Sequence, residues 1–329
     1  MIQFLIKGVI RDRSRSLMPV LVIAAGVALT VIMYCWVNGT FNNLVESNAK
    51  FQTGHVKIMS QAYADQADKL PNDLAYTGVN TLLYNLQEAY PEMIWLPRIR
   101  FGGLLDVPDE QGETRAQGPA FGMGVDLLNE NSHEKDILNL HESLVRGRLP
   151  QNPGEILISD DFAQKLKVNL GESITLLSST MYGSMAFYNF MISGTVRFGI
   201  VAMDRGAIIV DLADIQQALD MQNSAGEILG LFNDFHYNED TAYQIAAEFN
   251  HRFQNPENEF SPVMTTLRDQ NGLAQMLDAG KFGISLLIGI FLVLMFIVLW
   301  NVGLMGSLRR YGEIGIRLAI GEERGHIYR

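Results

Sequence analysis

Two long stretches of the sequence, Leu17–Val37 and Phe282–Met305, contain no charged side chain and are mostly apolar. An α-helix of about 20 residues is long enough to cross the ~30 Å hydrocarbon core of a bilayer. Each stretch therefore predicts a membrane-spanning helix, the first over residues 16–38 and the second over 281–306. The second stretch is too long and too uniformly apolar for a buried helix of a soluble domain.

The first apolar stretch follows a basic start, and a cleaved signal peptide has the same beginning. Signal peptides have apolar regions of only about 7–15 residues that end at a cleavage site of small residues. Here the stretch is longer, and Tyr34 and Trp36 stand where an interfacial aromatic belt would lie. The pattern favours an uncleaved anchor.

Charge is distributed unevenly along the chain, which has a net charge of −11. Basic side chains gather before the first stretch and after the second, whereas between the stretches acidic side chains outnumber basic ones two to one. Because Lys and Arg beside a span stay on the cytoplasmic side, both ends are predicted inside and residues 39–280 outside. An acidic domain without a basic stripe is a poor partner for nucleic acid.

Residues 1–15 combine apolar positions with Lys7 and Arg11 on another face. This pattern predicts a short amphipathic helix lying in the inner membrane surface, in contact with lipid. A frayed extension of the first span is the alternative.

The sequence lacks the motifs of common catalytic sites. It contains no phosphate-binding loop, no His-Glu-x-x-His pair and no Gly-x-Ser-x-Gly elbow, and its single cysteine, Cys35, falls in the first span. We therefore expect no enzyme activity, no metal site and no cofactor of its own, and an outer domain without disulfides. Mechanical work is the favoured role.

Residues 39–280 mix predicted strands and helices without strict alternation, which is typical of an α+β domain, here expected in two lobes. The expected strands are 54–58, 94–101, 102–107, 154–158, 174–177, 190–196 and 207–210, and 122–126 is expected to be the end of a further strand. The expected helices are 73–90, 160–166 with Asp160 as N-cap, 212–219 and 241–253, with a polar helical stretch before Leu144.

Residues 178–189 are predicted to form the tip of a long hairpin. Its apolar side chains are Met181, Tyr182, Met185, Phe187 and Tyr188. At a loop tip they would form an adaptable apolar surface for a partner outside the membrane. Alternatively, they fold under and pack on the domain.

Residues 307–329 follow the second span directly, and Glu313 and Arg317 in them are a favourable i,i+4 pair. The aliphatic pairs Ile314/Leu318 and Ile316/Ile320 point to different sides of the expected helix. An ordinary basic juxtamembrane helix is the alternative, but aliphatic side chains facing water indicate a protein partner.

This segment resembles the cytoplasmic signature of the FtsX-like permeases, the MacB/Lol group of ABC transporter membrane subunits. The residues that match are Arg310, Glu313, Ile314, Gly315, Arg317, Ala319 and Gly321, with one inserted residue, Leu318. The outer segment resembles the periplasmic core of the same group in several short pieces that keep their order and spacing. These pieces are 54–56, 124–126, 146–149, 154–158, 170–172, 192–195 and 208–218.

The resemblance implies a dimeric permease, of two identical or homologous subunits, in a bacterial inner membrane. A separate ABC ATPase that binds ATP and magnesium would drive it through a cytoplasmic coupling helix. The residues expected at that contact are Arg310, Glu313, Ile314, Gly315, Ile316, Arg317, Ala319 and Gly321. The group has four spans, so two further spans are expected beyond Arg329.

The lack of an ATPase ahead of the first span argues against the efflux pumps of the group. The aromatic hairpin and the Gly54-His55-Val56 start favour the lipoprotein-releasing Lol permeases, which implies contact with a lipoprotein and its periplasmic carrier. Export of a small molecule or peptide, a two-span sensor receptor and an activator of cell-wall hydrolases remain alternatives.

Overall fold

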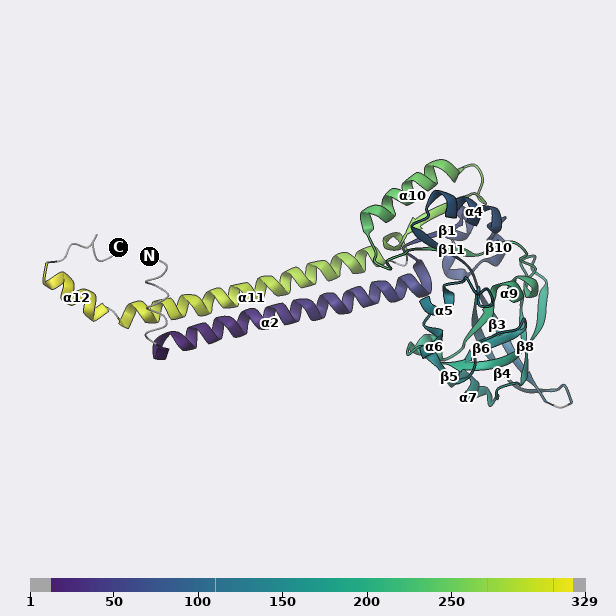
Figure 1. Cartoon of the computed structure of the whole chain (residues 1–329), viewed down its shortest axis with the longest axis horizontal. Coiled ribbons are helices and arrows are strands. Elements are labelled where there is room, and N and C mark those ends of the chain that lie inside the picture. Colours follow the sequence, from purple (N-terminus) through teal and green to yellow (C-terminus); the bar gives the residue numbers. More distant parts are fainter. Residues whose placement is uncertain (1–12, 110, 271, 310, 322–329) are drawn as a thin grey trace. The chain divides into compact units, whose positions relative to one another are not determined.

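The computed structural model describes residues 13–109, 111–270, 272–309 and 311–321 (Figure 1). The chain divides into two compact units, Met1–Leu44 with Gln275–Arg329 and Val45–Ala274. The amphipathic helix expected over residues 1–15 lies outside the described residues except for its last three positions, which already belong to the first long helix.

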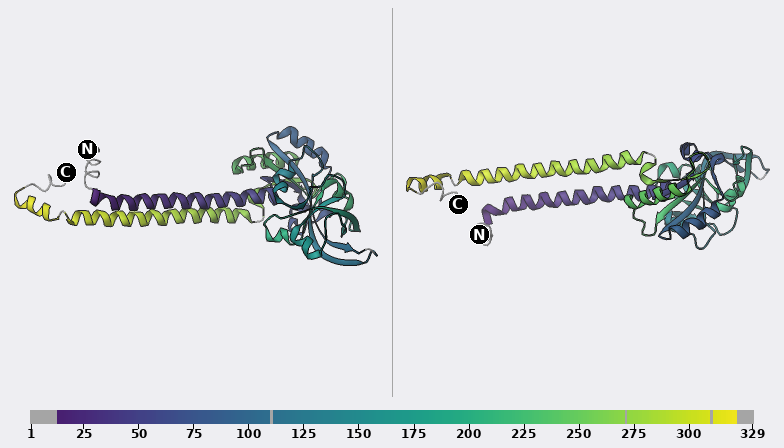
Figure 2. Two further views of the ribbon diagram at one scale, coloured as in Figure 1. Left: turned by 60° about the horizontal axis from the view of Figure 1, so that its bottom comes forward. Right: turned by 90° about the horizontal axis from the view of Figure 1, so that it is seen from above.

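The first unit contains most of two long antiparallel helices, α2 (Arg13–Asn48) and α11 (Leu273–Arg309), and then α12 (Tyr311–Ala319) (Figure 2). Val20–Thr53 and Leu273–Met305 are both long and apolar enough to cross a membrane, and no residue of their most apolar windows is buried. The two helices approach each other closely at glycines, which have no side chain. Gly26 lies against Met295, and Gly280 lies against Phe41. The predicted pair of apolar helices is confirmed.

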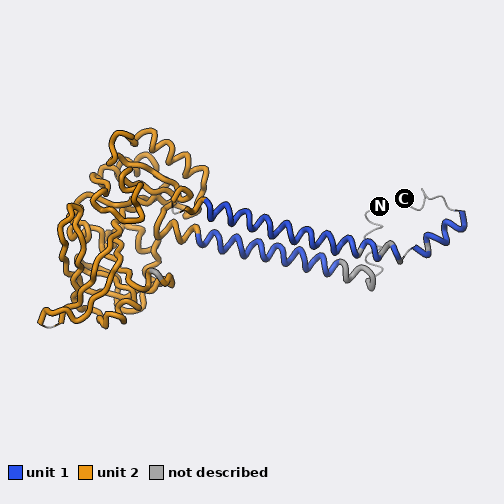
Figure 3. Tube along the Cα trace, turned by 180° about the vertical axis from the view of Figure 1, so that it is seen from behind, with its two compact units in different colours: residues 1–44, 275–329 blue, residues 45–274 orange. Residues whose placement is uncertain are grey.

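The second unit, orange in Figure 3, is the outer domain. Its strands are β1 (Val56–Ser60), β2 (Tyr76–Thr77), β3 (Met93–Pro108), β4 (Thr114–Val125), β5 (Leu144–Gly147), β6 (Glu155–Ser159), β7 (Ser173–Ser179), β8 (Met185–Val196), β9 (Ala207–Asp211), β10 (Ser224–Ala225), β11 (Glu227–Phe232) and β12 (Pro262–Thr266). Its helices are α3 (Gln61–Ala64), α4 (Val79–Ala89), α5 (Glu134–Ile137), α6 (Leu140–Ser143), α7 (Asp160–Leu166), α8 (Val201–Asp204), α9 (Leu212–Ala218) and α10 (Glu239–Phe253), with the short turns η1 (Ala49–Thr53), η2 (Ala67–Lys69), η3 (Asn72–Leu74) and η4 (Leu267–Asp269). The expected α+β class is confirmed.

The long strand β3 is shared by two lobes. Residues 93–98 pair with β11, and residues 99–108 pair with β4. The prediction of two separate strands at 94–101 and 102–107 is wrong, because Gly102 and Gly103 keep extended backbone and continue the ladder with β4. A single strand therefore connects the lobes without a loop.

The first lobe is an open antiparallel sheet in the order β12-β1-β11-β3. Side chains from one face of this sheet pack against α4 and α10. Central members of this core are Val56, Ile58, Leu82, Leu86, Ile228 and Phe249. Strands β11 and β12 were not predicted, since Glu227 and Pro262 at their starts obscure the alternation of apolar residues.

Asn250 of α10 covers the exposed edge of this sheet. Its side-chain amide accepts a hydrogen bond from the Met264 amide at 2.7 Å and donates one to the Met264 carbonyl at 2.8 Å. The side chain thus imitates the backbone of a further strand on β12. Edge strands present open hydrogen-bonding groups that can pair with other chains, and such a cover prevents that pairing.

Replacing Asn250 with Ala is therefore expected to lower stability by about 1–3 kcal/mol, because two backbone groups of Met264 lose their partners. Hydrogen exchange of the full chain should speed up at β12. Gln244→Ala, at an exposed position of the same helix, is the control. Equal exchange at β12 in both variants would contradict the assigned role of Asn250.

The second lobe is a closed barrel in which β3, β4, β9, β6, β8 and β7 follow one another and β7 returns to β3. Its interior holds Phe101, Ile156, Ile158, Phe190, Ile208 and Val210, and α7 and α9 add Phe162 and Ile215. Small barrels are filled by their own side chains rather than by solvent. The described residues of this lobe thus form a packed interior.

Strand β4 turns only small residues inward: Gly118, Ala120, Gly122 and Gly124. A Cβ on Gly118 would stand 2.9 Å from the Phe162 ring, one on Gly122 would overlap the Phe101 ring, and one on Gly124 would overlap Ile215. The missing side chains of β4 therefore make the space that these large residues fill.

Several local predictions need correction. Helix α7 spans the predicted residues, but its N-cap is Ser159, whose hydroxyl accepts from the Phe162 amide, rather than Asp160. The helix expected over 73–90 begins only at Val79, after Gly78. The polar stretch before Leu144 forms only the single turns α5 and α6.

Candidate functional site

The residues that sequence singles out for contact with an ATPase lie on and next to α12. Arg310 is outside the described residues, and Gly321 follows the helix with a positive φ of 97°. Ile316 and Ile320 are strongly exposed, whereas Ile314 is half-buried. Gly315, Arg317 and Ala319 are exposed. Ile316 in α12 and Ile320 just after it thus form an exposed aliphatic pair, and its contact with a partner stays a prediction.

The predicted hairpin tip is shorter than expected, because β7 and β8 continue to Ser179 and Met185. Met181 is only 9% exposed and belongs to the barrel core, and Tyr188 packs against that core. Tyr182, Met185 and Phe187 are 78%, 71% and 63% exposed. We call these three the hairpin surface. Within β8, the alternation of side chains between two faces turns Met185 and Phe187 outward and Tyr188 toward the core, whereas Met181 and Tyr182 lie in the turn between the strands.

Strand register extends the hairpin surface across the barrel wall. Phe187 pairs with Leu177 of β7, and Leu177 pairs with Leu104 of β3. Both leucines are half-buried. An apolar row thus runs from the hairpin onto the outer face of the barrel.

A second site, not anticipated from sequence, lies where the outer domain begins. The five residues of η1 follow α2 directly, and Asn48 keeps helical angles of φ −62° and ψ −42°. The Gly54 amide bonds to the carbonyl of Ala49 at 2.9 Å, one residue further back than in an α-helix. The carbonyl of Lys50 therefore loses the partner that an α-helix would supply. We call residues 49–55 the root.

Arg98 of β3 donates a hydrogen bond to this carbonyl. Its Nη1 donates to the Lys50 carbonyl oxygen at 2.7 Å, and its Nε and Nη2 donate to the two carboxylate oxygens of Glu134, each at 2.7 Å. Both side chains are only 1% exposed. A two-pronged Arg–carboxylate pair is strong and directional, and a cation at a helix C-terminus is favoured by the helix dipole. Arg98 thus caps the root.

The end of the root joins β1 through Gly54 and His55. Gly54 has a φ of 62°, and any Cβ there would collide with the Val56 carbonyl, so only glycine fits. The His55 ring accepts a hydrogen bond from the Phe232 amide at its Nδ1, at 3.0 Å. Burial lowers the pKa of His55 to about 4, against the charges of Asp234 and Glu46. His55 is therefore neutral near pH 7.

The end of the outer domain is tied to its start. Strand β12 pairs along the whole of β1, with Val56 opposite Thr266. The Gln270 side chain donates to the Thr53 carbonyl at 3.2 Å, and the Leu267 amide donates to the His55 carbonyl at 3.0 Å. The segments that precede α11 and follow α2 are thus held by direct hydrogen bonds.

The root also contacts the barrel lobe. The rings of Phe51 and Phe198 meet edge to face at 5.7 Å. Both rings pack on a small core outside the barrel that includes Val125, Leu138 and Ile209. One short helical turn therefore touches both lobes.

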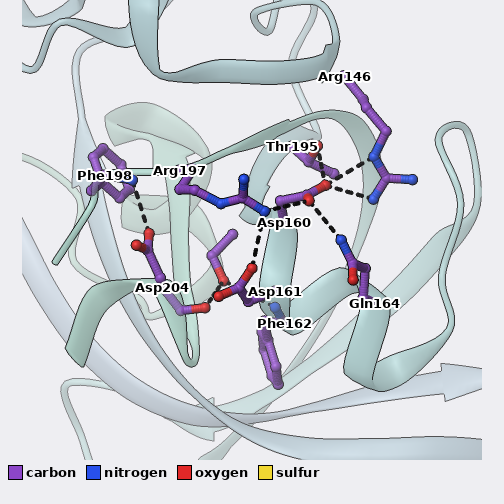
Figure 4. Close-up of polar contacts among 10 residues, drawn as sticks. Arg146, Asp160, Asp161, Phe162, Gln164, Thr195, Arg197, Phe198 and Asp204 are labelled. Atoms are coloured by element: carbon purple, nitrogen blue, oxygen red, sulfur yellow. Dashed lines mark hydrogen bonds and ion pairs between the residues drawn. The ribbon is translucent and has the colours of Figure 1, made fainter. Parts of the chain in front are cut away.

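A polar network fixes the segment that carries Phe198 (Figure 4). Asp160 accepts from Arg146 and Thr195 at 2.9 Å, from Gln164 at 2.8 Å and from Arg197 at 3.1 Å. Burial acts to raise the pKa of Asp160, but hydrogen bonds from Arg146, Thr195 and Gln164 outweigh it and hold the pKa below its usual value. Within the same network, Asp204 accepts from the Phe198 amide at 2.8 Å. These polar side chains satisfy one another, so the network serves structure.

In the described part of the chain, no three His, Cys, Asp or Glu side chains gather as a metal site would require. Sequence reasoning missed Arg98 and Glu134 because each is one charged residue in an unremarkable context. The available signal was Arg98 itself, within the apolar strand Met93–Phe101. A charge at such a position needs a buried partner.

Two apolar helices that carry an α+β domain, with the domain's start and end bound together at a root, define a membrane-anchored extracytoplasmic domain. The chain belongs to the family of the MacB-like periplasmic core domain, which matches residues 16–248. The outer domain is thus the periplasmic domain of a MacB/FtsX-like ABC transporter permease.

The solved structures that are similar to the chain include the following two. The periplasmic region of MacB from Actinobacillus actinomycetemcomitans is 12% identical with a TM-score of 0.44, covering 68% of this chain and 92% of its own. The extracellular domain of the noncanonic ABC-type transporter YknZ from Gram-positive bacteria is 11% identical with a TM-score of 0.41. The match covers 64% of this chain and 99% of the YknZ domain. No curated protein matches the sequence.

Proposed function

We propose that the chain is a permease subunit that moves its outer domain when a separate ABC ATPase hydrolyses ATP. The observation that carries this proposal is the root. One helical turn continuing α2 is bonded to the strand shared by both lobes and to the segment that precedes α11. Movement of either helix would therefore act on the whole outer domain, without any substrate crossing the bilayer.

The proposed organisation keeps the boundaries predicted from sequence: an interfacial helix over 1–15, spans over 16–38 and 281–306, the outer domain over 39–280 and a coupling segment over 307–329. The ATPase would bind α12 in the cytoplasm, and a second permease subunit would complete a dimer in the bacterial inner membrane. Family membership supports both partners.

Lipoprotein release is the proposed task. The support is the hairpin surface of Tyr182, Met185 and Phe187, which places exposed aromatic and thioether groups at the tip and along the second strand of the β7–β8 hairpin. Such a surface suits an acylated protein or its periplasmic carrier. Export of a small molecule or peptide is the second candidate, and it would not need this surface.

Co-purification tests the proposal. The full-length protein, extracted gently from native membranes, should bring down a soluble ATPase with a phosphate-binding loop, identified by mass spectrometry. Lipoproteins or a carrier protein recovered with the wild type, but not with a Tyr182→Ser/Phe187→Ser variant, would support lipoprotein release. Recovery of a kinase or response regulator instead of an ATPase would overturn the permease proposal in favour of a sensor.

Ile316→Asp should weaken ATPase recovery at least about tenfold, because the exposed aliphatic pair of α12 loses apolar burial at the contact and gains a charge. Ile314→Asp should also weaken ATPase recovery. Val201→Asp is the control, since Val201 is as exposed as Ile316, at 64%, but lies in the outer domain. Equal ATPase recovery from all three variants would contradict the assignment of α12.

A further inference from the structure

We infer that Arg98 is a positioning residue that makes the barrel lobe follow α2, through a latch formed by Arg98, Glu134 and the Lys50 carbonyl. This inference rests on the proposed function, since it names the contact through which the movement reaches one lobe.

The position of Arg98 on β3 is the first support. Arg98 pairs with Glu227 as one of the terminal pairs of the β3–β11 ladder, and the next residue, Ile99, opens the β3–β4 ladder by pairing with Gly124. Arg98 therefore stands at the boundary between the open sheet and the barrel. A force on its side chain is applied where the two lobes join.

The chemistry of the latch is the second support. The irregular turn of η1 frees the Lys50 carbonyl, and Arg98 binds it with the same guanidinium that holds Glu134. Arg presents these donors in a fixed planar fork and stays charged, whereas Lys would supply one flexible ammonium. Since both side chains are buried, water cannot readily replace either partner.

Glu134 carries the connection into the barrel lobe. It begins α5, and Leu138 at the end of α5 packs with Val125 of β4 and Leu157 of β6. Displacement of the Lys50 carbonyl is thus passed through Arg98 and Glu134 to the outer wall of the barrel.

The two lobes differ in what remains without the latch. The open sheet keeps direct hydrogen bonds to the root, from the His55 amide to Gly230 at 2.8 Å and from Leu267 to the His55 carbonyl. Apart from the latch, the described contacts between the root and the barrel lobe are the apolar packing around Phe51. Apolar packing has little directionality. Loss of Arg98 should therefore loosen the barrel relative to the root more than it loosens the open sheet, while β3 still connects the lobes.

The test measures distances between spin labels in the full chain, reconstituted in nanodiscs with its co-purified ATPase. Cys35 is replaced by Ser. One label stands at Ser47 beside the root and the second at Lys165 on the barrel or at Gln244 on the open sheet, all exposed positions. Each pair is measured with and without ATP and vanadate in the wild type, in Arg98→Met and in Arg115→Met.

Arg115 is a matched control, because it also binds one glutamate, Glu172, and one backbone carbonyl, that of Lys167, but on the exposed barrel surface. In the wild type and this control both distances should be narrow and unaffected by nucleotide. In Arg98→Met the Ser47–Lys165 distance alone should broaden and shift with nucleotide. Arg98→Lys should fall between, and Glu134→Gln should reproduce the effect if Arg98→Met folds poorly.

Three outcomes overturn the inference. Narrow distances in Arg98→Met and Glu134→Gln would mean that the latch is not needed, while the proposed function would stand. Equal broadening of both distances would mean that Arg98 only stabilises the domain. If the wild-type chain recruits no ATPase, the proposed function fails, and the role of Arg98 in transmission fails with it.

Discussion

Gly122→Val is expected to unfold the barrel lobe or to destabilise it by about 3 kcal/mol or more, at the upper end of the effects of overpacking. The added Cβ would fall on three atoms of the Phe101 ring, which is 1% exposed and sits on the neighbouring strand. An aromatic ring inside a closed barrel cannot turn aside, because β7 and β9 fix the wall around it. Chemical denaturation of the full chain in detergent would measure the loss.

Gly102→Val is the matched control for this substitution. Gly102 lies on β3 in the same ladder, but it faces outward and a Cβ there meets nothing within 4 Å. The stability of the Gly102→Val protein should stay close to that of the wild type. Phe101→Ala combined with Gly122→Val should recover part of the loss, since the smaller side chain returns the space. A Gly122→Val protein as stable as Gly102→Val would disprove the packing of the barrel interior.

The alternation of small residues in β4 shows why the barrel could not be predicted from sequence. No sequence pattern identifies a partner for the small residues at 118, 120, 122 and 124, which indicate only a weak strand because glycine has low strand propensity. Only the closed ring of strands, with Phe101, Phe162 and Ile215 turned inward, supplies the reason for them. The two spans were predictable because a bilayer demands an uninterrupted apolar run.

The candidate sites also divide into those that the sequence predicts and one that it does not. The expected coupling helix and the hairpin can be recognised in the sequence, because both have apolar side chains in segments that should face water. The latch depends on three groups distant in sequence, and one of them, the Lys50 carbonyl, is a backbone atom whose availability depends on the irregular turn of η1. No pattern of side chains in the sequence predicts that turn.

Stability should fall as the pH drops from about 6.5 to 4, and His55 is the expected cause. Its pKa is about 4 in the folded chain, against 6.5 for a histidine in water, so between these values the unfolded chain binds the additional proton. The stabilising contribution of neutral His55 is therefore complete above pH 6.5 and is lost by pH 4, a change of about 3 kcal/mol. Protonation would also abolish the bond from the Phe232 amide to Nδ1.

His55→Asn should flatten this pH dependence, because the Asn side-chain oxygen can accept from the Phe232 amide and does not titrate. His236→Asn, at an exposed position nearby, should retain the slope. The measurement is the midpoint of chemical denaturation of the full chain between pH 4 and 8. Because His55 binds the root to β1 and β11, local exchange at residues 49–58 should rise first as the pH falls. A slope unchanged in His55→Asn would mean that other groups, among them the buried carboxylates, govern the acid sensitivity of the domain.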